Sequence, residues 1–470
     1  MNIRATAQEP NVVSINVGGR IFQTTKQTLT LAGTDSLLSQ LATESTTRFV
    51  DRDPALFSVL LYIIRTGNIP ARSTSFDVRD LIEESRYYGI EPFLIDSLSN
   101  PSQFEAFDLR KSRILQLNGR DSPSTIAPTS NAGGGLHVAH GSKITSFDWS
   151  LRRKSTVLTN FSAVDSLLEI SPDVLAAGAT DFPGLQIIDL QNGGNVRTTL
   201  NWENVASSTV QGVGSSSEFL FASFESSRRN SNSIMVYDLS TLLPLLELDR
   251  RDIYGAGNDS AIPSNKLRWI QSCNLLMVSG SHASPSGVSG HVRFWDVRSR
   301  SMVCEIKERE DCFSDVAVSE NLSAVFKVGV ASGEVFYMDL RGLGSKDQPW
   351  VCLGEEKKRS LNERRGVGCK IESYGNHVFC SKGSGIELWS EVITGLVGNA
   401  SRDVLEERVF RKNSFAADSG ENKITGLTFG GSRIFVTRKD QQSIEASDLL
   451  DVVLRHRVLD HLLGSKRLRF

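Results

Sequence analysis

The chain has 470 residues, 39% of them apolar, and a formal net charge of −2, a composition typical of a globular protein with about two or three domains. Its 52 basic and 54 acidic residues nearly balance, which argues against a large phosphate-binding surface, so no nucleic-acid partner is expected. The longest apolar run, at 57–64, falls far short of the ~20 residues that span a bilayer. We therefore expect a soluble, cytoplasmic protein without membrane insertion.

The first predicted element is a β-hairpin. Val13, Ile15 and Val17 alternate with polar residues, which is the pattern of a half-buried strand. Gly18 and Gly19 then interrupt the pattern, and a second β-rich run begins at once. A phosphate-binding loop would need a helix to begin there, with Lys-Ser/Thr or a third glycine. The glycine pair is therefore interpreted as a turn.

A buried helix is predicted over about 54–66. Asp53 is a good N-cap, Pro54 suits the first helical position, and Gly67 suits the left-handed residue after the last turn. The segment is apolar nearly all round, so the helix is expected to be covered on most sides. Two further helical patterns follow it, at 76–90 and 91–98.

Three sequence blocks carry a family resemblance: "INVGGRIF" (15–22), "FVDRDPALFSVLLYIIRTG" (49–67) and "EESRYYGI" (83–90). In this order and spacing they resemble the BTB/POZ domain in its potassium-channel-tetramerisation (KCTD) subtype, which we assign to 11–100. The resemblance implies a small α+β domain that self-associates and serves either channel assembly or recruitment of a cullin-3-type ubiquitin ligase. Channel assembly is disfavoured because no downstream segment is long enough to cross a membrane.

The resemblance also suggests candidate interface residues. Polar residues before the buried helix are candidates for the homo-oligomer interface: Asp51, Arg52 and Asp53. The alternative is that the first two are solvated and the third is only a helix cap. Residues around the exit of the buried helix and the next turn are candidates for facing cullin-3: Arg65, Asn68, Ile69 and Tyr87. Each of these, taken singly, also fits a core or solvent position.

No metal site is predicted in this domain. Some channel relatives hold zinc between subunits with His and Cys ligands, but this sequence has no His before His137 and no Cys before Cys273. The six cysteines of the chain contain no C-x-x-C pair, so we expect reduced, mostly buried thiols.

Residues 101–135 are predicted to be a connection. An apolar side at 103–117 is compatible with a further helix, and 118–135 is rich in Gly, Ser, Pro and Asn, as in flexible linkers. We therefore expect the two parts of the chain to be loosely coupled.

From 136 to 460 the sequence repeats. A short strand that ends in an apolar residue followed by Asp recurs at intervals that average about 50 residues. The seven positions are Asp148, Asp189, Asp238, Asp296, Asp339, Ser390 in an Asp place, and Asp448. Other short strands flank each of them, which indicates four strands per repeat and a resemblance to the WD40-like β-propeller. Seven blades are predicted, with six or eight as alternatives, and ring closure is expected in the first unit, around 136–162, which lacks a clear innermost strand.

No catalytic motif accompanies this architecture. The recurring Asp is interpreted as a turn residue that accepts backbone N–H groups, because acid–base work would need two carboxylates converging on a pocket. The sequence contains no G-x-S-x-G, P-loop, H-E-x-x-H or Rossmann fingerprint, so we expect no enzyme, no catalytic residue and no cofactor. The basic tail at 455–470 leaves nuclear import as a minor alternative to a cytoplasmic location.

The sequence therefore suggests a multi-domain protein: a small α+β BTB/POZ domain followed by an all-β propeller. The functional hypothesis is a non-catalytic adaptor that oligomerises, binds cullin-3 and presents an unidentified client protein for ubiquitination. The alternative is an oligomeric scaffold unconnected to ubiquitin. A propeller enzyme would need His or carboxylate residues clustered in the central channel, which the predicted inner strands do not offer.

Overall fold

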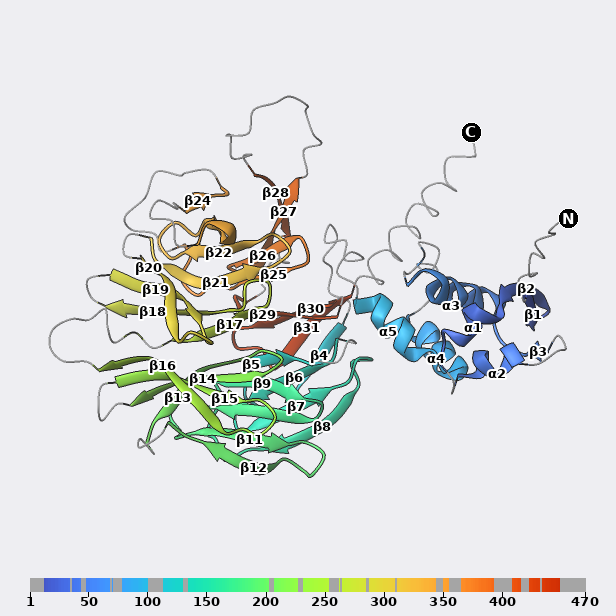
Figure 1. The fold of residues 1–470 in the computed structure, drawn as a ribbon, viewed down its shortest axis with the longest axis horizontal. Helices are drawn as coiled ribbons and strands as arrows, with labels where there is room; N and C mark the ends of the chain where they lie inside the picture. The colour runs from blue at the N-terminus through green and yellow to red at the C-terminus, as the bar shows by residue number, and fades with distance from the viewer. Residues whose placement is uncertain are drawn as a thin grey trace, which may run out of the picture.

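The computed structural model divides into an N-terminal module (residues 12–99) and a ring of β-sheets (residues 113–448), which lie side by side in Figure 1. The structure describes residues 12–33, 36–43, 48–67, 70, 78–99, 113–129, 134–202, 207–226, 231–252, 262, 264–284, 287–308, 311–343, 350–354, 365–392, 408–415, 422–431 and 433–448. A mixed α+β module followed by an all-β ring confirms the predicted fold class.

The N-terminal sheet is built on the predicted hairpin. Strands β1 (Val12–Val17) and β2 (Arg20–Thr25) are antiparallel, and β3 (Phe49–Val50) pairs parallel to β1. Gly18 and Gly19 connect the first two strands with φ values of 53° and 91°, both in the left-handed region that a tight hairpin turn requires. No helix begins at the glycines, so the prediction of a turn is confirmed.

The described residues of the N-terminal module also form five helices: α1 (Lys26–Thr30), α2 (Leu37–Thr43), α3 (Pro54–Thr66), α4 (Val78–Tyr88) and α5 (Glu91–Ser99). Helix α3 begins and ends where the sequence predicted. The Asp53 carboxylate accepts hydrogen bonds from the backbone N–H groups of Ala55 and Leu56, at 2.6 and 3.3 Å. Gly67 ends the helix at φ 71° and donates its N–H to the Ile63 carbonyl.

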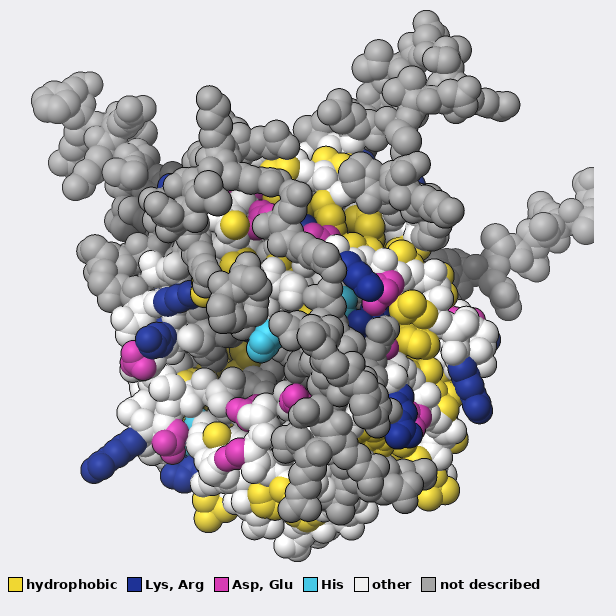
Figure 2. Space-filling model, turned by 90° about the vertical axis from the view of Figure 1, so that its left-hand side faces the viewer, with side chains coloured by type: hydrophobic (Ala, Val, Ile, Leu, Met, Phe, Trp, Pro, Cys, Tyr) yellow, Lys and Arg dark blue, Asp and Glu magenta, His cyan; other side chains and the backbone are white. Residues whose placement is uncertain are grey.

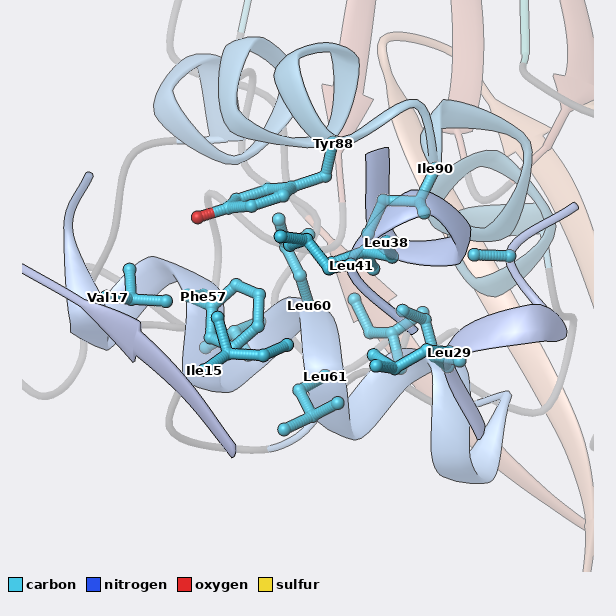
Figure 3. Packing of buried hydrophobic residues seen from close by; sticks show 14 of the residues in the cluster. Ile15, Val17, Leu29, Leu38, Leu41, Phe57, Leu60, Leu61, Tyr88 and Ile90 are labelled. Carbon is cyan, nitrogen blue, oxygen red and sulfur yellow. The ribbon is translucent and has the colours of Figure 1, made fainter. Parts of the chain in front are cut away.

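One apolar core joins this sheet to the helices. Figure 3 shows Ile15 and Val17 from β1, Phe57 and Leu60 from α3 and Tyr88 from α4 gathered in that core, and each is at most 1% exposed. The rings of Phe57 and Tyr88 lie 5.0 Å apart between centroids. Helix α3 is therefore covered on most sides by the rest of the module, as its apolar sequence indicated.

The described residues after 112 form seven antiparallel four-stranded sheets. The first three sheets are β5 (Pro123–Pro128), β6 (Leu136–His140), β7 (Lys143–Phe147) and β8 (Arg153–Leu158); β9 (Ser166–Ser171), β10 (Val174–Gly178), β11 (Leu185–Asp189) and β12 (Asn195–Leu200); β13 (Thr209–Ser215), β14 (Phe219–Ser226), β15 (Ser231–Asp238) and β16 (Pro244–Asp252). The next two are β17 (Lys266–Ile270), β18 (Leu275–Ser284), β19 (Gly287–Asp296) and β20 (Ser301–Glu308); β21 (Phe313–Ser319), β22 (Ala324–Gly329), β23 (Val335–Asp339) and β24 (Val351–Cys352), with a short 3-10 helix at Leu340–Gly342. The last two are β25 (Ile371–Tyr374), β26 (His377–Lys382), β27 (Gly385–Val392) and β28 (Val409–Phe415); β29 (Ile424–Gly430), β30 (Arg433–Arg438), β31 (Ser443–Asp448) and β4 (Arg113–Gln116).

The seven sheets close into a propeller. The first strand of each sheet contacts the first strand of the next, from β5 through to β29, and β29 contacts β5 again. Strands β10 and β11 are buried along their whole length, whereas β12 at the outer edge is largely exposed. Stacking on both neighbours explains why the middle strands appear in the sequence as continuous apolar runs.

The ring is closed by a strand that sequence analysis assigned elsewhere. Strand β4 pairs antiparallel with β31 and brings Leu115 opposite Ile444, so it supplies the fourth strand of the last sheet. The expectation of closure within the first unit was wrong, because β5 gives that sheet its innermost strand. The strand predicted after Asp448 lies outside the described residues.

The predicted connection at 101–135 is therefore corrected in two places. Residues 123–128 form β5, so the segment 118–135 is not a continuous linker and the ring begins before residue 136. The predicted helix at 103–117 ends in a strand, since 113–116 form β4; residues 103–112 lie outside the described residues. Both are terminal strands of their sheets and only partly buried. The Ser, Thr and Pro residues of β5 obscured the alternation that marks a strand, and β4 is only four residues long.

Candidate interaction surfaces

Backbone hydrogen bonds hold the segment before α3, which carries the predicted self-association residues. Gly18 in the hairpin turn donates its N–H to the Val50 carbonyl at 2.9 Å, so the turn is in direct contact with this segment. Asp53 is the helix cap described above, whereas the Asp51 side chain is exposed. Asp53 is also exposed, so the fold leaves both carboxylates in contact with solvent.

Arg52 brings the two predicted interfaces together. Its guanidinium lies 3.8 Å from the centroid of the Tyr87 ring, a cation–π contact. The same group lies 3.6 Å from the carboxylate of Glu84, one turn earlier on α4. A residue predicted to face a second copy therefore contacts a residue predicted to face cullin-3. Sequence spacing gave no sign of this, because 35 positions separate them.

The Glu84 carboxyl is the buried acid of this cluster. Its side chain is 6% exposed, and burial raises its pKa above the usual 4.5, while the Arg52 guanidinium opposes the rise. Arg52 is thus held between a buried carboxyl and an aromatic ring, with 41% of its side chain still exposed. The arrangement presents a cationic and an aromatic group together on the surface of the module.

The remaining predicted cullin-facing residues are not part of this cluster in the described structure. Arg65, in the last turn of α3, donates a hydrogen bond from its guanidinium to the Gln23 carbonyl of β2 at 2.9 Å. Asn68 and Ile69 lie outside the described residues. The structure thus brings Arg52 and Tyr87 together and assigns Arg65 to the packing of α3 on the sheet.

An apolar surface on the N-terminal sheet was missed by sequence analysis. On the face of β1 opposite the core, Asn16 pairs with Ile21 of β2 on one side and with Phe49 of β3 on the other. Ile21 is 63% exposed and Phe49 57% exposed. The alternation of β1 predicted which side chains face the core, but the outward row needs the register of β3, which only the fold supplies.

In the ring, the recurring Asp works as the turn residue that the sequence indicated. Asp189 and Asp296 each accept backbone N–H groups two and three residues ahead. Asp148, Asp238 and Asp339 also accept backbone N–H groups from the turn that follows them. These bonds fix the passage from the third to the fourth strand of a sheet. The turn role is thereby confirmed at these five positions.

One of these turns contacts the N-terminal module. Trp149, which follows the Asp of the first sheet, packs against the N-terminal core, and the Arg86 guanidinium of α4 lies 5.5 Å from its ring centroid. Arg152 of the same turn lies 3.5 Å from the Glu83 carboxylate. Arg433 of β30 donates a hydrogen bond to the Trp149 carbonyl. The two modules therefore touch directly, and the expectation of a loose connection was wrong for the described residues.

A cavity of about 480 Å³ lies at this junction, lined by residues of both modules.

Figure 2 shows the opposite face of the ring, where acidic and basic side chains are interspersed. Over the described parts of the chain, no three His, Cys, Asp or Glu side chains are grouped closely enough to hold a metal ion. The helices described are also too short or too polar to cross a bilayer.

The fold and its surfaces define a class: a protein that joins a BTB/POZ module to a β-propeller, two folds that typically serve as interaction modules. Comparison with known families supports this class. The BTB/POZ domain model matches residues 13–98, and the model of the At2g24240-like, C-terminal beta propeller matches residues 120–445. The chain belongs to the family of BTB/POZ proteins with this propeller.

Individual proteins of known sequence are also similar to this chain. The chain is 84% identical over 450 residues to the BTB/POZ domain-containing protein At5g41330 of Arabidopsis thaliana, which covers 95% of this chain and 98% of that protein. It is 29% identical over 315 residues to the Arabidopsis BTB/POZ domain-containing protein At2g24240, covering 62% and 67%. With human BTB/POZ domain-containing protein KCTD3 it shares 37% identity over 98 residues, which are 19% of this chain and 12% of that protein.

Proposed function

We propose that this protein is a substrate-specific adaptor of a cullin-3-based ubiquitin ligase. In this proposal the BTB/POZ module self-associates and binds cullin-3, and the propeller binds the client protein. The observation that carries the proposal is the direct contact between the modules through Trp149 and α4. That contact gives a client on the ring a defined position relative to the module that would bind the ligase.

The physical gain from this arrangement is effective concentration. A client bound to the ring is kept near the ubiquitin-carrying part of the ligase, and a second or third copy of the chain adds avidity without new contacts. The proposal assigns no chemical step to this chain. Its task is to hold two partners at a fixed separation.

Surface chemistry suggests where the two partners of the N-terminal module bind. Arg52 and Tyr87 present a paired cation and aromatic ring, and aromatic and Arg side chains are the types that dominate interface energetics. Ile21 and Phe49 add exposed apolar area on the sheet. We assign self-association to the segment of Asp51, Arg52 and Asp53, and cullin-3 binding to the neighbourhood of Tyr87.

The test is sedimentation velocity of the full chain alone and with the purified N-terminal region of cullin-3. We expect the chain alone to sediment as an oligomer and to form a complex with cullin-3 at micromolar concentrations. Tyr87→Ala should weaken the complex, whereas Tyr62→Ala, a tyrosine of similar exposure on α3, should leave it unchanged. An oligomer that does not bind cullin-3 would favour the second candidate, a scaffold unconnected to ubiquitin.

A further inference from the structure

The face of the ring that contacts the N-terminal module carries a second turn of the same kind. In the first sheet the turn between the third and fourth strands holds Trp149 against α4. In the third sheet the equivalent turn begins at Asp238 and lines a groove of about 520 Å³ with residues of the second sheet. We call this the sheet 2–3 groove; its lining includes Ile170, Val174, Arg197, Glu218, Asp238, Leu239 and Leu242.

The floor of the sheet 2–3 groove is apolar. Ile170, Leu239 and Leu242 are half-buried and pack against the core cluster shared by the second and third sheets. Val174 and Ile187 are buried beneath them and also line the groove. The half-buried side chains therefore offer apolar surface at the base of an open hollow.

Leu242 has a backbone conformation that residues other than glycine rarely adopt. Its φ is 58°, in the left-handed region, where a non-glycine residue costs about 1 kcal/mol or more. The same position, four residues after the turn's Asp, is Gly193 in the second sheet and Arg300 in the fourth. The turn therefore needs no leucine there. Leu242 packs partly against the core cluster, and the rest of its side chain lines the groove, where a ligand can contact it.

Hydrogen bonds fix the backbone of the turn on both sides of Leu242. The Asp238 carboxylate accepts hydrogen bonds from the backbone N–H groups of Ser240 and Thr241, at 3.0 and 2.8 Å, and from both hydroxyl groups. The Leu242 N–H then donates to the Asp238 carbonyl at 2.8 Å. A preformed apolar contact binds a ligand with less entropic loss than a mobile one.

The rim of the groove carries excess negative charge. Hydrogen bonds from Ser240 and Thr241 lower the pKa of Asp238 to about 2, so it is ionised at neutral pH, and Glu218 is exposed beside it. The one cation in the described lining, Arg197, donates two hydrogen bonds to Asp189, at 3.0 and 2.7 Å. The charge of Arg197 is thus balanced by a carboxylate of its own sheet, and the two rim carboxylates favour a cationic partner.

We propose that the sheet 2–3 groove binds an extended segment of the client protein in which an aliphatic side chain stands next to Lys or Arg. This rests on the proposed function, because it names the chemistry of the client. The aliphatic side chain would contact Leu239 and Leu242, and the cation would pair with Glu218 and Asp238. Because the turn of Trp149 lies on the same face, the bound segment is held on the side of the ring that carries the BTB/POZ module.

The test uses a displayed library of random short peptides selected on the full-length protein. Leu242→Gly removes the apolar contact and relieves the left-handed backbone, so the ring should stay folded. Arg300→Gly makes the same exchange at the equivalent position of the fourth sheet and serves as the matched control. We expect enriched peptides that combine Leu, Ile or Val with a neighbouring Lys or Arg, and at least about fivefold weaker binding to Leu242→Gly than to Arg300→Gly.

Glu218→Lys provides a second readout, since it reverses an exposed rim charge without touching the turn. It should weaken the same peptides, and most strongly at low salt. The proposal is overturned if no enriched peptide depends on Leu242, or if the Leu242-dependent peptides are acidic. Cullin-3 binding is measured on the same variants: its absence alongside groove-dependent peptides removes the ligase proposal and leaves the groove, and the reverse pattern removes the groove alone.

Discussion

The two modules of this protein are stabilised in different ways. The N-terminal module has one core, in which Phe57 and Leu60 of α3 meet the sheet and the other helices. The ring has seven separate clusters of buried residues, spread around its sheets, and it is complete only when β4 pairs with β31. The stability of the N-terminal module therefore depends on single central residues, whereas that of the ring depends on its closure.

The largest expected effect comes from opening the ring. A chain that begins at residue 119 lacks β4 and leaves β31 as an unpaired edge, with Ile444 and Ala446 of the last sheet uncovered. We expect the ring of this chain to lose about 5 kcal/mol or more of its free energy of unfolding, which is a third or more of the stability of a typical domain. A chain that begins at residue 101 retains β4 and is the control. Equal melting temperatures by calorimetry would contradict the role of β4.

The second effect tests the single core of the N-terminal module. Phe57 is fully buried between the rings of Phe22 and Tyr88, so Phe57→Ala should destabilise this module by about 3–5 kcal/mol. Tyr62→Ala, on the same helix at 39% exposure, should cost much less. Calorimetry should show the change in the transition of the N-terminal module, with the ring transition unmoved. A shift of the ring transition by the same amount would mean that the modules unfold as one unit.

The third prediction concerns the close contact between the hairpin turn and the segment before α3. Gly18 and Gly19 both have positive φ, but a Cβ at Gly18 would lie 2.5 Å from the Arg52 carbonyl, whereas a Cβ at Gly19 meets nothing within 4 Å. Gly18→Ala should therefore cost about 2–3 kcal/mol and Gly19→Ala about 1 kcal/mol, measured by urea unfolding. Equal costs would show that the turn does not press on this segment.

The fourth effect concerns the pH dependence of the ring. His140 is fully buried beside Thr145, and burial lowers its pKa below the usual 6.5, with the Lys143 charge acting in the same direction. The unfolded chain therefore binds this proton at a higher pH than the folded chain does, so the free energy of unfolding falls as pH drops below 6.5. His140→Gln should flatten this dependence in melting experiments, and His282→Gln, at an exposed site, should leave it unchanged. A steeper decline for His140→Gln would refute the assignment.

The smallest effect is expected at the junction of the modules. Both partners of the Arg152–Glu83 ion pair are more than half exposed, so Arg152→Ala should change the stability by at most about 1 kcal/mol. Trp149→Ala should instead loosen the junction, because it removes the packing against the N-terminal core. Small-angle scattering would then report a wider distribution of shapes for Trp149→Ala than for Arg152→Ala. Identical scattering from both variants and the unaltered chain would show that Trp149 does not set the arrangement.

The sequence was informative wherever the physical signal is local. Asp53, Pro54 and Gly67 lie within one helix length of each other, and their capping preferences alone predicted where α3 begins and ends. The recurring Asp also marks its turn locally, since its hydrogen-bond partners are two to four residues ahead. These features do not depend on the rest of the chain.

The sequence alone did not predict the features that depend on contacts between distant parts of the chain. Leu115 lies opposite Ile444 across more than 300 residues, and nothing in the segment around Leu115 names its partner. The same reason hid the contact of Arg52 with Tyr87 and the outward row of Ile21 and Phe49. The groove at Leu242 was equally hidden, because it exists only where two neighbouring sheets meet.

The central claim is tested most directly by reconstituted ubiquitin transfer with purified full-length protein and a cullin-3 ligase. The account predicts that the chain, or a reporter fused to a peptide selected on the sheet 2–3 groove, becomes ubiquitinated only when cullin-3 is present. Transfer to the chain should decline with Tyr87→Ala, and transfer to the reporter also with Leu242→Gly. Transfer that is absent with cullin-3, or that proceeds equally without it, would contradict the account.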